Sequence, residues 1–118
     1  MRALIVDDEL AVSRILSRYL IQWGWVADEA PCVSSAFDAF RRRPYDLLIS
    51  DVDLPDGDGV ILAHALLKAN PELTVIIVSG DPDNLGRARK GGLPTCLHKP
   101  FALEELRVLI DLERAGKS

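Results

Sequence analysis

The sequence predicts an α/β protein whose five-stranded parallel sheet is doubly wound, with helices on both faces. Short apolar runs that suit strands buried on both sides alternate five times with segments whose apolar residues repeat at helical spacing. Such alternation is typical of parallel sheets, because a crossover helix returns the chain to the same end of the sheet. With 118 residues, 48% of them hydrophobic, the chain has the size of one domain, which we expect to span residues 1–118.

The first strand and the first helix follow directly from apolar spacing. The run ALIV at 3–6 is short and continuous, as expected for a strand covered on both faces. A helix should follow, because apolar residues recur at offsets of 3, 4, 7, 8 and 11; they are Val12, Ile15, Leu16, Tyr19, Leu20 and Trp23. Gly24 is a typical residue for ending such a helix.

Two further strand–helix pairs occupy the middle of the chain. The stretch WVADEA at 25–30 predicts a short strand, and the helical stripe over 33–40 should end before Pro44. A helix ends there because the residue preceding a proline disfavours helical geometry. DLLIS at 46–50 predicts the third strand, and the helix over 62–69 likewise stops before a proline.

The last part of the chain completes the alternation. TVIIVS at 74–79 predicts the fourth strand, since it is rich in β-branched residues. A weakly amphipathic segment over 84–90 predicts a short helix, ended by a glycine pair. TCLH at 95–98 is the fifth strand. The final helix, over 103–115, has acidic residues early and Arg114 late, as the helix dipole favours.

Polar and charged residues follow four of the predicted strands, at the edge of a parallel sheet where functional crevices form. They are Asp7, Asp8, Asp51, Ser79 and Lys99. Three carboxylates this close together repel one another, so positive charge must be present to keep them ionised. Lys99 supplies one charge, and a divalent metal would supply the rest. The oxygen-only set of ligands favours Mg²⁺ and leaves an open site suited to phosphoryl transfer onto a carboxylate.

The aspartate-rich stretch DVDLPDGDG could also suggest a calcium-binding loop, but its spacing excludes one. An EF-hand loop needs oxygen ligands at positions 1, 3 and 5 and a glutamate at position 12. Counted from Asp51, position 5 is Pro55 and position 12 is Leu62. Counted from Asp53, position 3 is already Pro55. The two later aspartates of the stretch are interpreted as turn formers and not as ligands.

Four motifs together resemble a known family. LIVDDE, DLLISDVDLPDGDG, VIIVSG and HKPF, in this order and at these intervals, are similar to the receiver domain of bacterial two-component response regulators. Each motif is weak by itself, but four in register are specific, and the resemblance covers the chain from Arg2 to about Ala115. It implies a flavodoxin-like sheet with strand order 2-1-3-4-5.

The resemblance implies roles for individual residues at the acidic edge. Asp51 resembles the phosphoacceptor, which receives a phosphoryl group from the phosphohistidine of a sensor histidine kinase or from a phosphotransfer protein. Asp8 resembles the direct Mg²⁺ ligand, and Asp7 acts beside it through a water molecule. The Asp51 carboxylate and the backbone carbonyl of Asp53 complete the implied metal site.

The same resemblance describes a switch. Ser79 corresponds to the hydroxyl that binds the phosphoryl group after activation, and Lys99 to the lysine that pairs with it, with a cis bond expected before Pro100. Activation should change the surface around the fourth and fifth strands and the fourth helix. The family usually carries an aromatic residue three positions before the lysine, where this chain has Cys96. The segment from Ser79 to Lys99 is also short for the family, so the acceptor chemistry is better supported than its readout.

Three other functions share parts of this pattern. A haloacid-dehalogenase-type phosphatase also uses a DVD-like motif, but its nucleophile lies on the first strand, where this chain has Asp7 and Asp8. A flavodoxin-like cofactor binder needs a phosphate-cradling loop there, and two anions are unsuited to it. A receiver-fold interaction module that does not accept phosphate keeps the whole fold, so only labelling of Asp51 distinguishes it. We expect a regulatory phosphoacceptor, not an enzyme.

Composition limits the partners and the compartment. The net charge of −4 argues against direct binding of nucleic acid, which needs clustered Lys and Arg. Apolar runs stay well below the ~20 residues that span a bilayer, so no membrane association is expected. The two cysteines follow no metal-site spacing and are interpreted as reduced thiols of a cytoplasmic protein. The sequence identifies neither the kinase nor the downstream protein or output domain.

Overall fold

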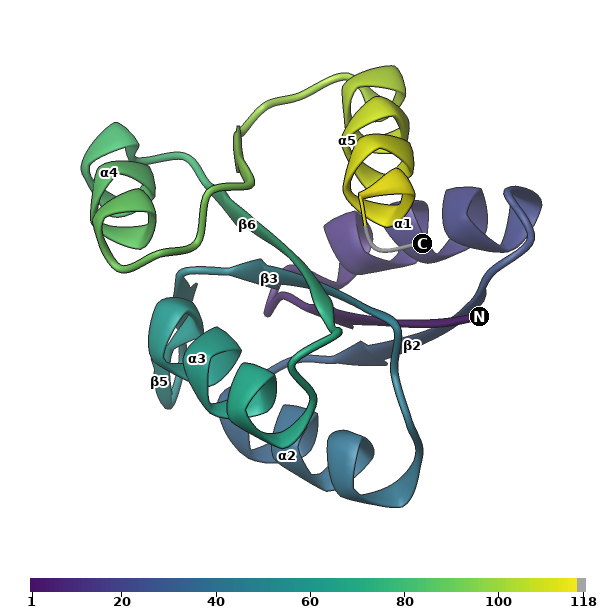
Figure 1. Cartoon of the computed structure of the whole chain (residues 1–118), viewed down its shortest axis with the longest axis horizontal. Helices are drawn as coiled ribbons and strands as arrows, with labels where there is room; N and C mark the ends of the chain where they lie inside the picture. The colour runs from purple at the N-terminus through teal and green to yellow at the C-terminus, as the bar shows by residue number, and fades with distance from the viewer. Residues whose placement is uncertain (117–118) are drawn as a thin grey trace.

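A five-stranded parallel sheet forms the centre of the computed structural model, which describes residues 1–116 (Figure 1). Its strands are β1 (Arg2–Val6), β2 (Val26–Ala30), β3 (Leu47–Asp51), β6 (Thr74–Ser79) and β7 (Cys96–His98). They are ordered β2-β1-β3-β6-β7, and every neighbouring pair is parallel. This is the predicted order 2-1-3-4-5. The last two residues of the expected domain, 117 and 118, lie outside the described residues.

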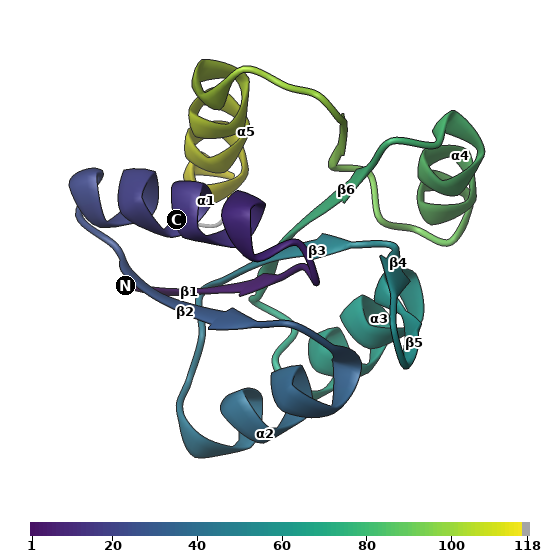
Figure 2. The ribbon, with the colours of Figure 1, turned by 180° about the vertical axis from the view of Figure 1, so that it is seen from behind.

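Five helices cover the sheet as a doubly wound fold requires. They are α1 (Leu10–Gln22), α2 (Val33–Arg42), α3 (Gly59–Ala69), α4 (Pro82–Lys90) and α5 (Leu103–Ala115). Helices α1 and α5 lie on one face, and α2 and α3 lie on the other (Figures 1 and 2). The short helix α4 lies apart from these pairs and packs against β6 and β7. No helix within residues 1–116 is both long and apolar enough to span a bilayer.

Two hydrophobic cores explain why the strands are apolar on both faces. Leu4 and Val6 of β1 belong to the core under α2 and α3, whereas Ala3 and Ile5 belong to the core under α1 and α5. All four side chains are fully buried. Successive residues of a strand point to opposite faces, so a strand between two helical layers needs apolar residues at every position.

The strand bounds differ from the predicted ones by one residue at most, and the helices differ mainly where they begin. Helix α3 begins three residues before the predicted stripe, because Asp58 caps it by accepting the amide protons of Val60 and Ile61. Helix α1 also begins two residues early, and it ends near Gly24, whose φ of 95° lies in the left-handed region. The spacing of apolar residues does not report such contacts at helix ends, so it predicts the helix bounds less well than the helices themselves.

The predicted turn after β3 contains a small antiparallel hairpin. Its strands are β4 (Asp53–Leu54) and β5 (Gly57–Asp58), and the residue opposite Asp53 is Asp58. Strands of two residues have no periodicity that could predict them. The hairpin is nevertheless important, because it lies between the end of β3 and the start of α3.

A partly buried polar network joins β1, β2 and the segment before β3. The Tyr45 hydroxyl donates a hydrogen bond of 2.6 Å to Asp28 Oδ2, and the Arg2 guanidinium donates one of 3.0 Å to the same oxygen. Tyr45 is 2% exposed. Burial, followed by the hydrogen bond to Asp28, raises the pKa of Tyr45 from 10.0 to about 12. The neutral phenol is therefore stabilised in the folded protein.

We predict that this network makes the protein more sensitive to alkali. A pKa raised on folding gives stability that is complete below pH 10 and is lost as the pH rises toward 12. Over this window the wild type should lose about 2 kcal/mol of unfolding free energy relative to Tyr45→Phe. Urea unfolding followed by circular dichroism at several pH values measures this difference. Tyr19→Phe removes the other tyrosine hydroxyl, and its unfolding free energy should depend on pH as that of the wild type does. If the pH profile of Tyr45→Phe ran parallel to that of the wild type, the raised pKa of Tyr45 would not be the cause of the alkaline sensitivity.

Candidate functional site

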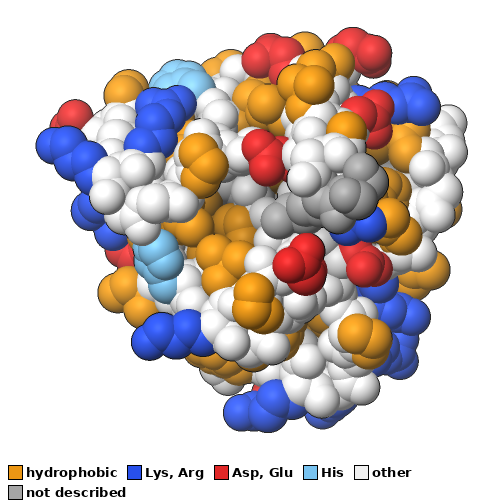
Figure 3. Space-filling view, in the orientation of Figure 1, with side chains coloured by type: hydrophobic (Ala, Val, Ile, Leu, Met, Phe, Trp, Pro, Cys, Tyr) orange, Lys and Arg blue, Asp and Glu red, His pale blue; other side chains and the backbone are white. Residues whose placement is uncertain are grey.

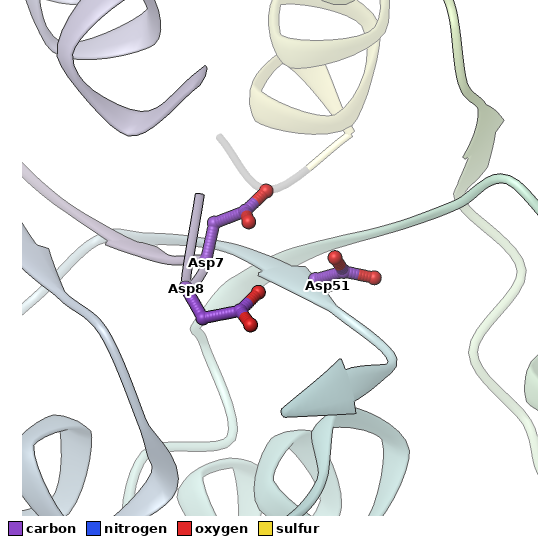
Figure 4. Close-up of side chains that lie close together, drawn as sticks. All are labelled: Asp7, Asp8 and Asp51. Atoms are coloured by element: carbon purple, nitrogen blue, oxygen red, sulfur yellow. The ribbon is translucent and has the colours of Figure 1, made fainter. Parts of the chain in front are cut away.

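Three aspartates meet beyond the ends of β1 and β3. Asp7, Asp8 and Asp51 extend their carboxylates in the same direction from neighbouring strands (Figure 4), with oxygens within 4.8 Å of one another. They meet because β1 and β3 are adjacent and parallel. Asp7 is 2% and Asp51 9% exposed, whereas Asp8 is exposed. The predicted acidic cluster is therefore present, with one member open to solvent.

Lys99 links the two buried carboxylates. Its Nζ donates hydrogen bonds of 2.9 Å to Asp7 Oδ2 and 3.0 Å to Asp51 Oδ2. The Lys99 backbone amide donates to the carbonyl of Ser79, which holds the residue against the end of β6. Burial opposes the charged ammonium, but the hydrogen bonds to Asp7 and Asp51 and their charges outweigh it and raise the pKa of Lys99. The ammonium stays charged at neutral pH.

The site has the donor set of a hard divalent cation. One ammonium lies among three carboxylates, so negative charge remains, and every available ligand is an oxygen. Both Asp7 oxygens already accept protein hydrogen bonds, from the Glu9 amide and from Lys99. Asp8 is exposed, so it is the more accessible direct ligand. The cluster is compatible with a divalent metal.

Ser79 is buried at the end of β6, beside β3. Its Oγ accepts hydrogen bonds of 3.0 Å from the Asp81 amide and 3.4 Å from Asn84 Nδ2. These partners turn the hydroxyl toward the start of α4. The predicted site residues Asp51, Lys99 and Ser79 thus lie on three adjacent strand ends, and the Lys99–Pro100 peptide bond is cis.

Cys96 begins β7 and packs against the core under α2 and α3. Its thiol donates to the carbonyl of Leu93 at 3.4 Å, and burial raises its pKa, with Arg89 opposing the effect. The side chain is a small, half-buried, protonated group. No ring therefore occupies the position where the resemblance implies an aromatic residue.

The two later aspartates of the hairpin segment cap helices. Asp56 accepts the amide protons of Val33 and Ser34 at the start of α2, at 2.7 and 3.0 Å. These hydrogen bonds, that of Ser34 first, lower the pKa of Asp56. Asp58 caps α3 and forms a 2.8 Å ion pair with Arg87 of α4. Both residues lie in the predicted turn and cap helices there. Sequence spacing carries no signal for the role of Asp56, whereas the position of Asp58 just before an apolar stripe is one that a cap would occupy.

Gly59 packs directly against the strand that carries Asp51. A Cβ at this position would lie 1.8 Å from the Asp51 carbonyl oxygen and 2.9 Å from Ser50 Oγ. The nearest atom is backbone, so this contact is relieved only if the end of β3 or the start of α3 shifts. Only glycine therefore allows α3 to begin this close to the acidic cluster.

We predict that Gly59→Ala destabilises the protein by about 3 kcal/mol, since the methyl group must displace the end of β3. Urea unfolding monitored by circular dichroism measures the change. Gly86→Ala is the matched control: apart from its chain neighbours and the backbone of its own helix, nothing in residues 1–116 lies within 4 Å of the added Cβ, and a helix-interior alanine should stabilise by about 0.5–1 kcal/mol. A neutral Gly59→Ala would show that α3 can move away from Asp51 without cost.

Comparisons with known proteins agree with this geometry. Residues 3–111 match the response regulator receiver domain, and the chain belongs to this family. Probable transcriptional regulatory protein TcrX of Mycobacterium tuberculosis is 36% identical over 118 residues, covering 96% of this chain and 50% of its own length. Transcriptional regulatory protein RprY of Bacteroides fragilis is 31% identical over 113 residues, covering 94% and 48%. This chain spans about half the length of these curated relatives.

The fold is also that of solved receiver domains. The beryllofluoride-activated NtrC4 receiver domain dimer superimposes with a TM-score of 0.89 at 30% identity, covering 99% of this chain and 98% of that one. The chain is thus a receiver domain of two-component phosphorelay signalling, a class of regulatory receivers and not of classical enzymes. Receiver domains of this class interact with kinases and output domains. The family favours this function over the phosphatase and flavodoxin-like alternatives.

Proposed function

We propose that Asp51 accepts a phosphoryl group from the phosphohistidine of a sensor histidine kinase or of a phosphotransfer protein. The observation that carries this is the place of the Asp51 carboxylate: it lies at the rim of the sheet, hydrogen-bonded to Lys99 and within 4.8 Å of two further carboxylates. At 9% exposure it is partly shielded from water yet reachable from outside.

The chain's own residues supply position and charge. A carboxylate oxygen of Asp51 attacks phosphorus as the bond to the donor imidazole breaks. The Lys99 ammonium already forms an ion pair with Asp51, so it offsets the charge of the incoming phosphoryl oxygens. Ser79, one strand away, supplies a hydroxyl that can turn to a phosphoryl oxygen. The domain itself catalyses at most its own phosphorylation and its dephosphorylation, in which water takes the phosphoryl group from Asp51.

Mg²⁺ is the proposed cofactor. Asp8, Asp51 and the backbone carbonyl of Asp53 would hold it, with Asp7 acting through a water molecule because both of its oxygens accept protein hydrogen bonds. Bound there, it would neutralise charge on the phosphoryl oxygens. The oxygen-only donors and the excess of carboxylates over ammonium support this choice.

The proposed readout is a change of the segment 80–95 and α4. The Ser79 hydroxyl is hydrogen-bonded to Asp81 and Asn84, both within this segment, so its movement toward a phosphoryl group must alter these contacts. Cys96 is too small to fill the space that an inward-turning ring would occupy, and burying such a ring contributes about 1.5–3 kcal/mol. The switch is therefore weaker than an aromatic one. It acts on a downstream protein or output domain, without direct binding of nucleic acid.

We place these events in the cytoplasm. Both cysteines, Cys32 and Cys96, are free thiols, and proteins of oxidising compartments usually pair theirs.

We predict that a small acyl-phosphate donor adds one phosphoryl group to the protein with Mg²⁺ and none with EDTA. Mass spectrometry of the intact protein measures the addition. Asp51→Asn should abolish it, whereas Asp56→Asn should keep it, since Asp56 caps α2. A label that persists in Asp51→Asn would show that another residue is the acceptor. A wild type that is never labelled would instead favour the interaction module that does not accept phosphate.

We predict that Asp8→Asn weakens Mg²⁺ binding at least tenfold, because it removes the accessible charged ligand. Calorimetry or an NMR titration measures the affinity. Asp56→Asn and Asp58→Asn are the controls: they change the same charge nearby, and asparagine still caps helices. Equal losses in all three variants would indicate a diffuse acidic patch without a defined metal site.

A further inference from the structure

Two side chains of α4 bind the β4–β5 hairpin. Asn84 Nδ2 donates to Asp53 Oδ2 at 3.2 Å, and Arg87 forms its 2.8 Å ion pair with Asp58. Asn84 and Arg87 are three residues apart, so they share one face of the helix. Asp53 and Asp58 lie opposite each other in the hairpin. One helix face thus matches one cross-strand pair, and the hairpin borders the acidic cluster.

Asn84 also contacts the switch residue. Its Nδ2 lies 3.4 Å from Ser79 Oγ, which accepts a further hydrogen bond from the Asp81 amide. The side-chain amide of Asn84 therefore joins the hairpin, the end of β6 and the first turn of α4. While Ser79 accepts these bonds, its hydroxyl oxygen is engaged by the start of α4.

Helix α4 is a small element with few residues in the core. It has nine residues, the fewest among the described helices, and buries only Leu85 and Ala88. Gly86 lies in its middle, where glycine lowers helix stability. Lys and Arg side chains gather over this part of the surface (Figure 3), and the last turn of α4 carries Arg87, Arg89 and Lys90. With two residues in the core, α4 is also held by its polar contacts with the hairpin.

We propose that Asn84 and Arg87 form a clamp that holds α4 on the β4–β5 hairpin and restrains phosphoryl acceptance at Asp51. The inference rests on the proposed function. Rotation of the Ser79 side chain onto a phosphoryl oxygen would move Oγ away from Asn84, which removes one of the contacts of the clamp. Contacts made only in the unphosphorylated arrangement stabilise that arrangement and lower the population that binds the phosphoryl group. Asn84 and Arg87 are positioning residues in this scheme.

The test measures binding of Mg²⁺ and beryllofluoride, a mimic of the phosphoryl group, by calorimetry. Asn84→Ala and Arg87→Ala should each bind the mimic about threefold more tightly than the wild type, and the double variant about tenfold. Amide hydrogen exchange of residues 82–90 without metal or mimic should become faster in the same variants, since the helix is then held less firmly. Circular dichroism checks that each variant is folded.

Matched controls separate the clamp from a general effect of charge or helix stability. Arg89→Ala removes the same charge from the same helix, but Arg89 forms no ion pair with any residue in 1–116, so its affinity should equal that of the wild type. Arg87→Lys keeps the charge facing Asp58 and should restore most of the wild-type behaviour. At 1 M NaCl the difference between the wild type and Arg87→Ala should shrink, because the pair is partly exposed and screened.

The outcomes distinguish this inference from the function on which it rests. A wild type that binds beryllofluoride, with Asn84→Ala and Arg87→Ala equal to it or weaker, would overturn the clamp and leave the phosphoacceptor function intact. The clamp would be overturned even if amide exchange of α4 became faster in these variants. Such a result would mean that Asn84 and Arg87 anchor the helix but do not restrain phosphoryl acceptance at Asp51. A wild type that binds no beryllofluoride in the presence of Mg²⁺ would instead overturn the proposed function.

Discussion

The ammonium of Lys99 lies between two buried carboxylates, and the arrangement of the acidic edge depends on it. Asp7 and Asp51 come from adjacent parallel strands, so the fold itself brings like charges together. Burying charged groups without partners is costly, and Lys99 supplies hydrogen bonds and opposite charge to both at about 3 Å. Lys99 is in turn held by its backbone bond to Ser79. Four strand ends are thereby joined through one residue, by its side chain and its backbone amide.

The aspartates of the segment after β3 divide into two kinds with different physical roles. Asp51 belongs to the site, whereas Asp56 and Asp58 satisfy amide groups at the starts of α2 and α3. Free amide groups at a helix start favour a nearby carboxylate, both through hydrogen bonds and through the helix dipole. The β4–β5 hairpin, which carries both of these aspartates, therefore fixes two helices relative to the end of β3. A single loop thus serves both structure and chemistry.

Stability is unevenly distributed over the fold in a way that suits a switch. The strands β1, β3 and β6 are buried on both faces, and the Tyr45–Asp28–Arg2 network secures the side of the sheet formed by β1 and β2. Helix α4 has little buried surface and lies apart from the other helices (Figure 1). Elements that move in regulation are drawn from the least stable parts of a protein. With Cys96 in place of a ring, polar contacts of α4 become the natural means of coupling it to Asp51.

Much of this protein is determined by local sequence alone. Short apolar runs predicted the five strands of the central sheet, and apolar residues at helical spacing predicted the five helices, because burial acts on each element independently. The rule that parallel strands share their carboxyl ends then placed Asp7, Asp8, Asp51, Ser79 and Lys99 on one edge, and the structure brings them together there.

Only the tertiary structure decided the contacts that join distant segments. Asp56 caps a helix 22 residues earlier in the chain, and Asn84 reaches Asp53 across 31 residues. The β4–β5 hairpin and the place of α4 beside it likewise have no signature in the sequence pattern. Such contacts depend on how layers pack and on which polar groups remain unsatisfied once they have packed, and neither condition exists until the sheet and its helices are assembled.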